Sequence, residues 1–170
     1  MSHKLSRRDF FTSFLKRWQT DEKKQPSGFT PTLLQADKHL ANQEYRKALE
    51  YYLAYLQTEP NQLGVLKKCG YCYFRLHEFE QARKFFQKAM AIRPKEQFCI
   101  LYQGLSYAYE GDLEQAIATW KAYFNLDTPL IQREINVLIG LYETGEELDY
   151  QQVVQDVEKA IASQNSNESN

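Results

Sequence analysis

The sequence predicts an all-α protein built from repeated pairs of helices. Three alanines, Ala48, Ala82 and Ala116, follow one another at an equal 34-residue step. An aromatic residue follows each alanine by four positions: Tyr52, Phe86 and Trp120. A bulky apolar residue precedes each alanine by three positions: Tyr45, Phe79 and Leu113. A fixed period of about 20 to 50 residues is typical of repeat architectures, so we expect an α-solenoid.

Each 34-residue unit is expected to contain two amphipathic helices joined by a short turn. A small residue lies twelve positions before each alanine, where it lets the paired helix approach closely. These small residues are Ala36, Gly70 and Gly104, and the turns fall at Asn42-Gln43-Glu44, His77-Glu78 and Gly111-Asp112. Proline lacks an N–H donor and clashes with the preceding helical turn. Pro60, Pro94 and Pro129, the last displaced by one position, are therefore expected to end the second helices.

This register resembles that of the tetratricopeptide repeat (TPR) family. The resemblance covers residues 29–130 in three units, 29–62, 63–96 and 97–130. The middle unit matches best, and the first departs at Ala36 and His39. No single unit can bury its apolar face alone, so the resemblance implies that stacking between neighbouring units forms the fold.

Residues 131–162 are predicted to form a degenerate fourth helix pair that caps the stack. Ile131, Ile135 and Leu138 fall at helical spacing, and a last amphipathic helix is expected from about Tyr150 to Ala162. Terminal repeats need a polar outer face, which the glutamines and charged residues of this helix supply. The polar residues 163–170 are predicted to be a disordered tail.

The resemblance implies a concave groove that binds a protein or peptide through the first helix of each unit. Positions 2, 5, 9, 12 and 13 line this groove in the family, and they are aromatic or aliphatic here with few charges. The groove residues carried over are Leu33, Asp37, Lys67, Tyr71, Phe74, Arg75, Phe98, Leu101, Leu105, Tyr109, Ile139 and Tyr142. This set suits an apolar peptide or an amphipathic helix. It does not suit the chaperone-tail clamp, because Leu33 and Asp37 replace the Lys and Asn that the clamp needs.

The amino-terminal part of the chain differs in charge from the rest. Residues 1–24 hold seven basic and three acidic residues, whereas the remainder carries a net charge of −5. A basic amphipathic helix is predicted within residues 1–20, followed by a linker at 21–28. Its apolar stripe comprises Phe10, Phe11, Phe14, Leu15 and Trp18, with Arg7, Arg8, Lys16 and Arg17 off the stripe. Large apolar side chains on a short isolated helix require a partner surface.

Three partner surfaces remain open for residues 6–18. The helix could lie on an anionic membrane surface, fold back onto the repeats of its own chain, or be recognised by another protein. The stretch Ser6-Arg7-Arg8-Asp9-Phe10-Phe11 resembles the twin-arginine export motif. An uncharged apolar stretch and a cleavage site should follow such a motif, but charged residues follow here, so export is not predicted.

The composition and motifs argue against catalysis, cofactors and nucleic acid. Near-zero net charge disfavours a general nucleic-acid binder, and no apolar run is long enough to span a bilayer. Cys69 and Cys72 form a C-x-x-C inside a predicted helix, where cysteine packs as a small hydrophobe. The remaining cysteine and histidines lack metal-ligand spacing. We find no phosphate-binding loop or nucleophile motif, and therefore predict no enzyme, cofactor or metal.

The sequence therefore favours a non-enzymatic adaptor or scaffold that binds a protein or peptide in its groove. The resemblances permit a role as an accessory or assembly factor for a bacterial redox or respiratory enzyme. The alternative is a peripheral membrane scaffold anchored by residues 6–18. A cytoplasmic location, with possible attachment to the inner face of the membrane, fits both. The oligomeric state stays open, because a dimer could bury exposed aromatic residues as well as a ligand could.

Overall fold

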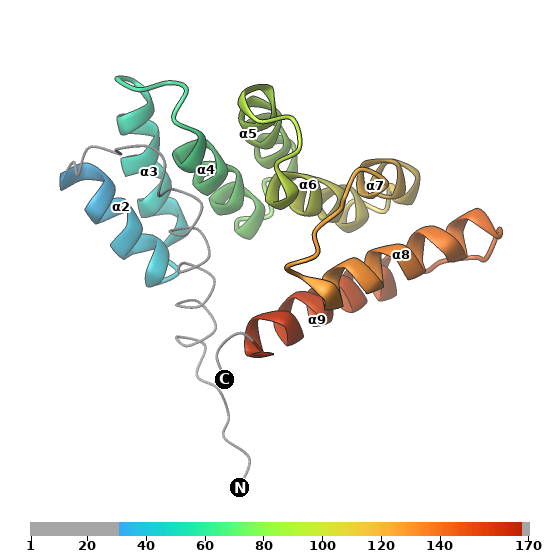
Figure 1. Cartoon of the computed structure of the whole chain (residues 1–170). Coiled ribbons are helices and arrows are strands. Elements are labelled where there is room, and N and C mark those ends of the chain that lie inside the picture. The colour runs from blue at the N-terminus through green and yellow to red at the C-terminus, as the bar shows by residue number, and fades with distance from the viewer. Residues whose placement is uncertain (1–30, 168–170) are drawn as a thin grey trace, which may run out of the picture.

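The computed structural model describes residues 31–167, which form antiparallel helix pairs stacked into a curved solenoid (Figure 1). The first three pairs are α2 (Pro31–Ala41) with α3 (Tyr45–Leu56), α4 (Leu63–Arg75) with α5 (Phe79–Ile92), and α6 (Gln97–Tyr109) with α7 (Leu113–Trp120). The fourth pair is α8 (Pro129–Glu143) with α9 (Tyr150–Asn167). The prediction of an all-α solenoid with three helix pairs and a fourth terminal pair is confirmed. The predicted amino-terminal helix and linker lie outside the described residues.

The 34-residue period is visible in the backbone of the turns within all four pairs. Gln43, His77, Gly111 and Gly145 have positive φ angles of 61°, 59°, 79° and 82°, and the same 34-residue step separates each from the next. In each turn, the amide of the next residue donates to a carbonyl five residues back, as from Glu78 to Tyr73. A left-handed residue with this hydrogen bond is a standard way to end a helix. The fourth pair therefore keeps the repeat register, although its side-chain landmarks are weak.

A glycine and an aromatic ring meet at the centre of the second and third pairs. A Cβ atom added to Gly70 would lie 2.4 Å from the Phe86 ring, and one added to Gly104 would lie 2.2 Å from Trp120. Phe86 and Trp120 are fully buried. The Trp120 indole N–H also donates to the Leu101 carbonyl at 3.1 Å, which satisfies its polar atom inside the core. The predicted close approach of paired helices at these glycines is confirmed.

The end of the third unit differs from the prediction. α7 ends at Trp120, well before Pro129, and Pro129 occupies the first turn of α8. Proline is well suited to begin a helix, because its missing N–H would have no intrahelical partner there. The intervening segment is held by side-chain hydrogen bonds, such as that from the Phe124 amide to Gln97 at 2.7 Å. Pro129 therefore starts the fourth pair instead of ending the third.

The fourth pair does not continue the regular stacking. Its α8 contacts α7, but α9 is the helix that packs against α6, so the pair crosses the end of the stack (Figure 1). At the position that corresponds to the interior glycines, one repeat step after Gly104, this pair carries the buried Leu138. A leucine there leaves no room for the close helix approach that glycine permits.

The carboxyl-terminal helix is longer than predicted. α9 extends to Asn167, and Gln164 and Asn165 in its last turns are buried. The Gln164 side chain accepts a hydrogen bond from the Leu130 amide at 3.1 Å and so fastens α9 to the start of α8. The prediction of a disordered tail from residue 163 is wrong for residues 163–167, because polar side chains found hydrogen-bond partners within the fold.

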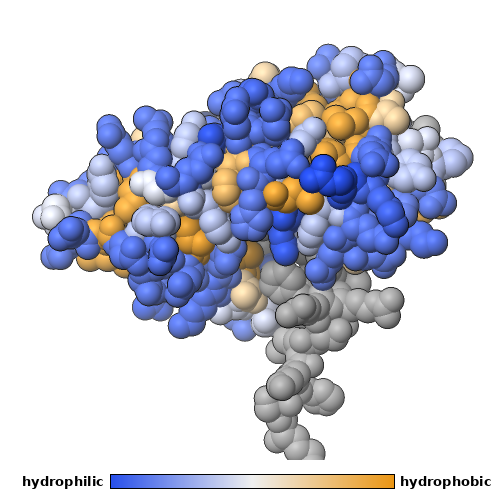
Figure 2. Space-filling view, turned by 180° about the vertical axis from the view of Figure 1, so that it is seen from behind, coloured by the Kyte–Doolittle hydropathy of each residue, from blue (hydrophilic) through white to orange (hydrophobic). Residues whose placement is uncertain are grey.

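The face opposite to that of Figure 1 is mostly hydrophilic, with hydrophobic atoms gathered in separate patches (Figure 2). The described chain has no helix that is both long and apolar enough to cross a bilayer.

We expect glycine-to-alanine substitutions to have opposite effects at Gly104 and Gly140. Gly104→Ala forces the Trp120 ring to move and should destabilise the fold by about 1–3 kcal/mol. A Cβ at Gly140, which is exposed in the last turn of α8, meets nothing within 4 Å. Gly140→Ala should therefore stabilise the fold by about 0.5–1 kcal/mol, through higher helix propensity. Urea denaturation of both variants measures the two changes, and equal effects would contradict the close contact.

Candidate partner-binding site

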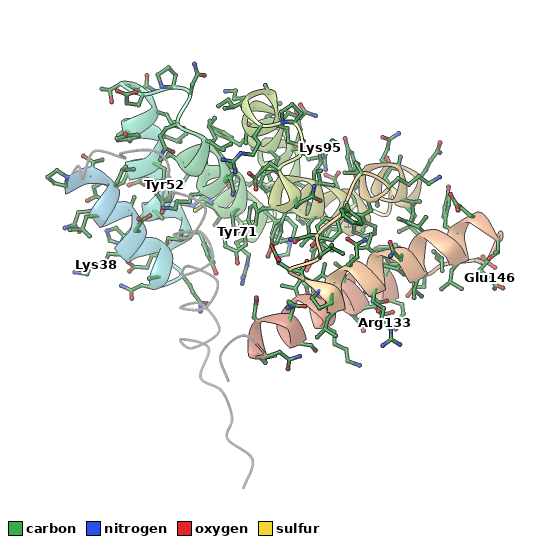
Figure 3. All side chains as sticks on the ribbon, viewed as in Figure 1. Lys38, Tyr52, Tyr71, Lys95, Arg133 and Glu146 are labelled. Carbon is green, nitrogen blue, oxygen red and sulfur yellow. The ribbon has the colours of Figure 1, made fainter. Side chains whose placement is uncertain are left out.

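A hollow of about 420 Å³ lies on the inner side of the solenoid, between α4, α6 and α9. The lining side chains are largely aromatic with a few charges. They are Tyr71, Phe74, Arg75, His77, Tyr102, Leu105, Tyr109, Glu158 and Ile161. Tyr71 lies on the side of α4 that faces α9 (Figure 3). We call this feature the inner hollow.

The aromatic side chains of the inner hollow pack against one another. Tyr102 makes edge-to-face contacts with Tyr71 and Phe74, with ring centroids 5.3 and 5.1 Å apart. Tyr109 makes a further such contact with Phe74 at 5.6 Å and stacks on Phe79 at 5.1 Å. These separations are within the favourable range for aromatic pairs. The wall of the hollow is therefore fixed before any ligand arrives.

Arg75 places a positive charge at the edge of this aromatic wall. Its guanidinium donates to the Tyr71 hydroxyl at 3.1 Å and lies over the Tyr45 ring, 5.1 Å from the centroid. Among the described residues no carboxylate forms an ion pair with Arg75. Burial raises the pKa of Tyr71 to about 12, so its hydroxyl stays neutral at physiological pH. Arg75 is therefore held in place and keeps its charge for an incoming ligand.

Glu158 of α9 provides a negative charge on the opposite side of the inner hollow. Its carboxylate accepts a hydrogen bond from the Tyr109 hydroxyl. Partial burial raises the pKa of Tyr109, and this hydrogen bond raises it further. No Lys or Arg among the described residues pairs with Glu158. The inner hollow thus presents aromatic side chains together with one cation and one anion.

Five of the residues predicted from the sequence meet in this hollow. Tyr71, Phe74, Arg75, Leu105 and Tyr109 line it together. They come from corresponding positions of α4 and α6, which lie beside each other in the stack.

Four other predicted residues have structural partners around the inner hollow. Lys67 forms a buried ion pair with Glu96 at 2.9 Å. Asp37 accepts from Lys68 at 3.0 Å and from the Tyr52 hydroxyl. Phe98 packs on Tyr102 with ring centroids 4.5 Å apart. Leu101 is buried, and its carbonyl accepts from Trp120.

The remaining predicted residues do not line the inner hollow. Leu33 of α2 is half-buried against the core. Ile139 is half-buried, and Tyr142 is exposed on α8. The family register places the first helix of the fourth unit at the groove, but α9 has that place here. Ile139 and Tyr142 therefore lie away from the lining.

Four lining residues were missed by the family register. Tyr102 continues the stripe of Phe98, Leu105 and Tyr109 at helical spacing, so the periodicity of α6 could have identified it. His77 lies in the turn after α4, and its ring contacts Tyr109. Glu158 and Ile161 carry no sequence signal, because their position depends on how the fourth pair crosses the stack.

The three cysteines lie inside the helix pairs. Cys69, Cys72 and Cys99 are free thiols and are fully buried. Burial raises the pKa of Cys72 to about 12 and also raises those of Cys69 and Cys99. A thiol reacts as its thiolate, so these environments disfavour redox chemistry. Within residues 31–167 there is also no group of three or more His, Cys, Asp or Glu side chains placed to hold a metal ion.

We expect all three thiols to react slowly in the folded protein. With a pKa of about 12, only about one Cys72 in ten thousand is a thiolate at pH 8. A chromogenic disulfide reagent at pH 8 should label the native protein far more slowly than the urea-unfolded protein. Fast labelling of one thiol in the native state would contradict the buried environment.

Residues 6–18, which include Arg7, Arg8, Phe10, Phe11, Phe14, Leu15 and Trp18, lie outside the described residues. The predicted roles of this segment, including the twin-arginine resemblance, stay predictions.

Comparisons with known proteins agree with the repeat architecture. Residues 39–105 match the family model described as tetratricopeptide repeat. The chain is 33% identical over 75 residues to the Photosystem I assembly protein Ycf3 of Prochlorococcus marinus (strain NATL1A), covering 42% of this chain and 43% of that protein. It is 32% identical over 90 residues to the Intraflagellar transport protein 70B of Homo sapiens, covering 53% of this chain and 13% of that protein. The chain thus spans less than half of the length of these curated relatives.

The solved structure of MamA MSR-1 C2 superposes with a TM-score of 0.57 at 14% sequence identity, covering 89% of this chain and 90% of that chain. This likeness shows the fold alone. Residues 39–105 thus match the tetratricopeptide repeat family, the four turns keep a 34-residue register, and the described residues fold as an all-helical solenoid.

Proposed function

We propose that this protein is a non-enzymatic adaptor whose inner hollow binds a helix or peptide of a partner protein. The observation that carries the proposal is the preformed aromatic wall of Tyr71, Phe74, Tyr102 and Tyr109, with Arg75 at its edge. Tyrosine and arginine are among the residues that most often dominate binding energy at protein interfaces. A wall that is already packed loses little side-chain freedom on binding, which favours affinity.

The chemistry of the inner hollow favours a partner with an amphipathic segment. The apolar side chains of such a segment would pack on the half-buried ring of Tyr109. A carboxylate on its flank would meet Arg75, and a basic side chain would meet Glu158. Binding of this kind is reversible and needs no covalent step.

A finer proposal is that the partner belongs to a multi-subunit redox complex under assembly. The support is the similarity to a protein named for photosystem I assembly, together with the twin-arginine resemblance of residues 6–11. That similarity covers less than half of either chain, and its partner is not carried over to this protein.

Peptide display tests the adaptor proposal without knowledge of the natural partner. A random peptide library would be panned against the chain without residues 1–24, since the buried core described here lies between Ala36 and Ile161. We expect the selected peptides to carry aromatic or aliphatic residues at helical spacing. Arg75→Glu and Tyr109→Ala should each weaken their binding by about tenfold, the loss expected when an anchor of about 1.4 kcal/mol is removed.

Arg133→Glu is the matched control, because it makes the same charge change on the exposed part of α8 outside the inner hollow. Its binding should remain as in the unchanged chain. Selected peptides that bind the Arg75 and Tyr109 variants as tightly as the unchanged chain would exclude the inner hollow as the binding site.

The alternative role is a peripheral membrane scaffold anchored by the basic and aromatic residues 6–18. If it holds, the full chain should co-sediment with vesicles containing anionic lipid, and substitution of Phe14 and Trp18 by Ser should abolish co-sedimentation. Equal binding to neutral and anionic vesicles would argue against the basic residues as the anchor. The unchanged chain in the presence of high salt provides the electrostatic control.

A further inference from the structure

We propose that the inner hollow is occupied in the resting protein by residues 6–18 of the same chain. This inference rests on the proposed function, because it assigns a first occupant to the same binding surface. A partner would then bind by displacing the segment.

The length of the chain before α2 fits this arrangement. Residues 6–18 would form a helix about 20 Å long. Packed helices lie about 8–10 Å apart, so a helix of this length reaches across two neighbouring spacings, such as α4 to α6 and α6 to α9. Residues 19–30 join the segment to Pro31 and span up to about 40 Å when extended. The connection is therefore longer than the two or three helix spacings, of about 8–10 Å each, that separate α2 from α4 and α6 in the stack.

The polarity of the chain brings opposite charges together. The segment connects to α2, at the end of the stack far from α9 (Figure 1). Trp18 then lies nearer α2, and Arg7 and Arg8 lie nearer α9. The described residues from 143 to 158 include six acidic side chains and no Lys or Arg. Glu158 is the member of this acidic stretch that lines the inner hollow.

The apolar surfaces of the two parts also correspond. The segment carries the apolar stripe of Phe10, Phe11, Phe14, Leu15 and Trp18. The inner hollow offers the half-buried ring of Tyr109 beside Glu158, whereas its Phe74, Leu105 and Ile161 side chains are already buried. The apolar stripe needs a partner surface, and the Tyr109 ring would provide one within the same chain.

Covalent attachment makes this contact strong even when the intrinsic affinity is modest. A flexible connection of this length gives an effective concentration on the order of 1 mM. A segment with an intrinsic dissociation constant of about 0.1 mM would then be docked in about nine of ten molecules. The apparent affinity for a competing partner would fall about tenfold, because only one molecule in ten has an open hollow.

Tryptophan quenching in the full chain tests the proposal directly. The protein has two tryptophans, and Trp120 is fully buried, so acrylamide quenching reports mainly on Trp18. We expect Trp18 in the full chain to be quenched several-fold less strongly than in a synthetic peptide of residues 1–24. Phe14→Ser in the stripe and Glu158→Lys in the hollow should each restore strong quenching.

Thr12→Ser, off the stripe, and Glu114→Lys, on the exposed side of α7, are the matched controls and should leave Trp18 shielded. Thermal unfolding of each variant confirms that the repeats remain folded. Quenching equal to that of the peptide would overturn the proposal. Shielding that grows with protein concentration would assign the segment to a second copy, and shielding only with anionic vesicles would assign it to a membrane; both overturn it.

This outcome is separable from the adaptor proposal. Peptides selected on the chain without residues 1–24 report on the inner hollow alone. If these peptides bind and Trp18 of the full chain is exposed to quencher, the adaptor proposal holds and only the proposal of an internal occupant is wrong.

Discussion

The close contact of a glycine with an aromatic ring inside the central helix pairs is the constraint on which the rest of this structure depends. Gly70 against Phe86, and Gly104 against Trp120, bring the two helices of a pair so near that no Cβ atom fits between them. Because this contact recurs with the period of the repeat, each of these pairs presents the same faces to its neighbours. The pairs then stack in one direction, and the first helices lie side by side along the inner surface.

The aromatic inner surface follows from that alignment. Tyr71 and Phe74 lie on the inner side of α4, where their rings contact Tyr102 of α6.

Charged side chains connect the neighbouring helices to one another around this surface. The buried pair of Lys67 and Glu96 joins α4 to the start of α6. Each charge of such a buried pair depends on the other, because removal of one partner leaves a buried charge without compensation.

The fourth pair shows what happens when the constraint is relaxed. Its turn keeps the 34-residue register at Gly145, yet Leu138 fills the position at which the second and third pairs hold a glycine. The pair crosses the stack and brings α9 against α6. The crossing shapes the inner hollow, because Glu158 of α9 supplies its acidic side. A regular fourth repeat would have placed α8 there instead.

The sequence alone determined the helix pairs, their 34-residue register and five of the residues that line the inner hollow, including Tyr71 and Arg75. These features are local or periodic, so side-chain type and spacing are enough to specify them. Only the tertiary structure decided the crossing of the fourth pair, the helical course of residues 163–167 and the place of Glu158. Each of these depends on contacts between segments far apart in the chain, such as Gln164 with Leu130, for which no local pattern exists. Tyr102 lies between the two cases, because its helical spacing was present but the family register left it out.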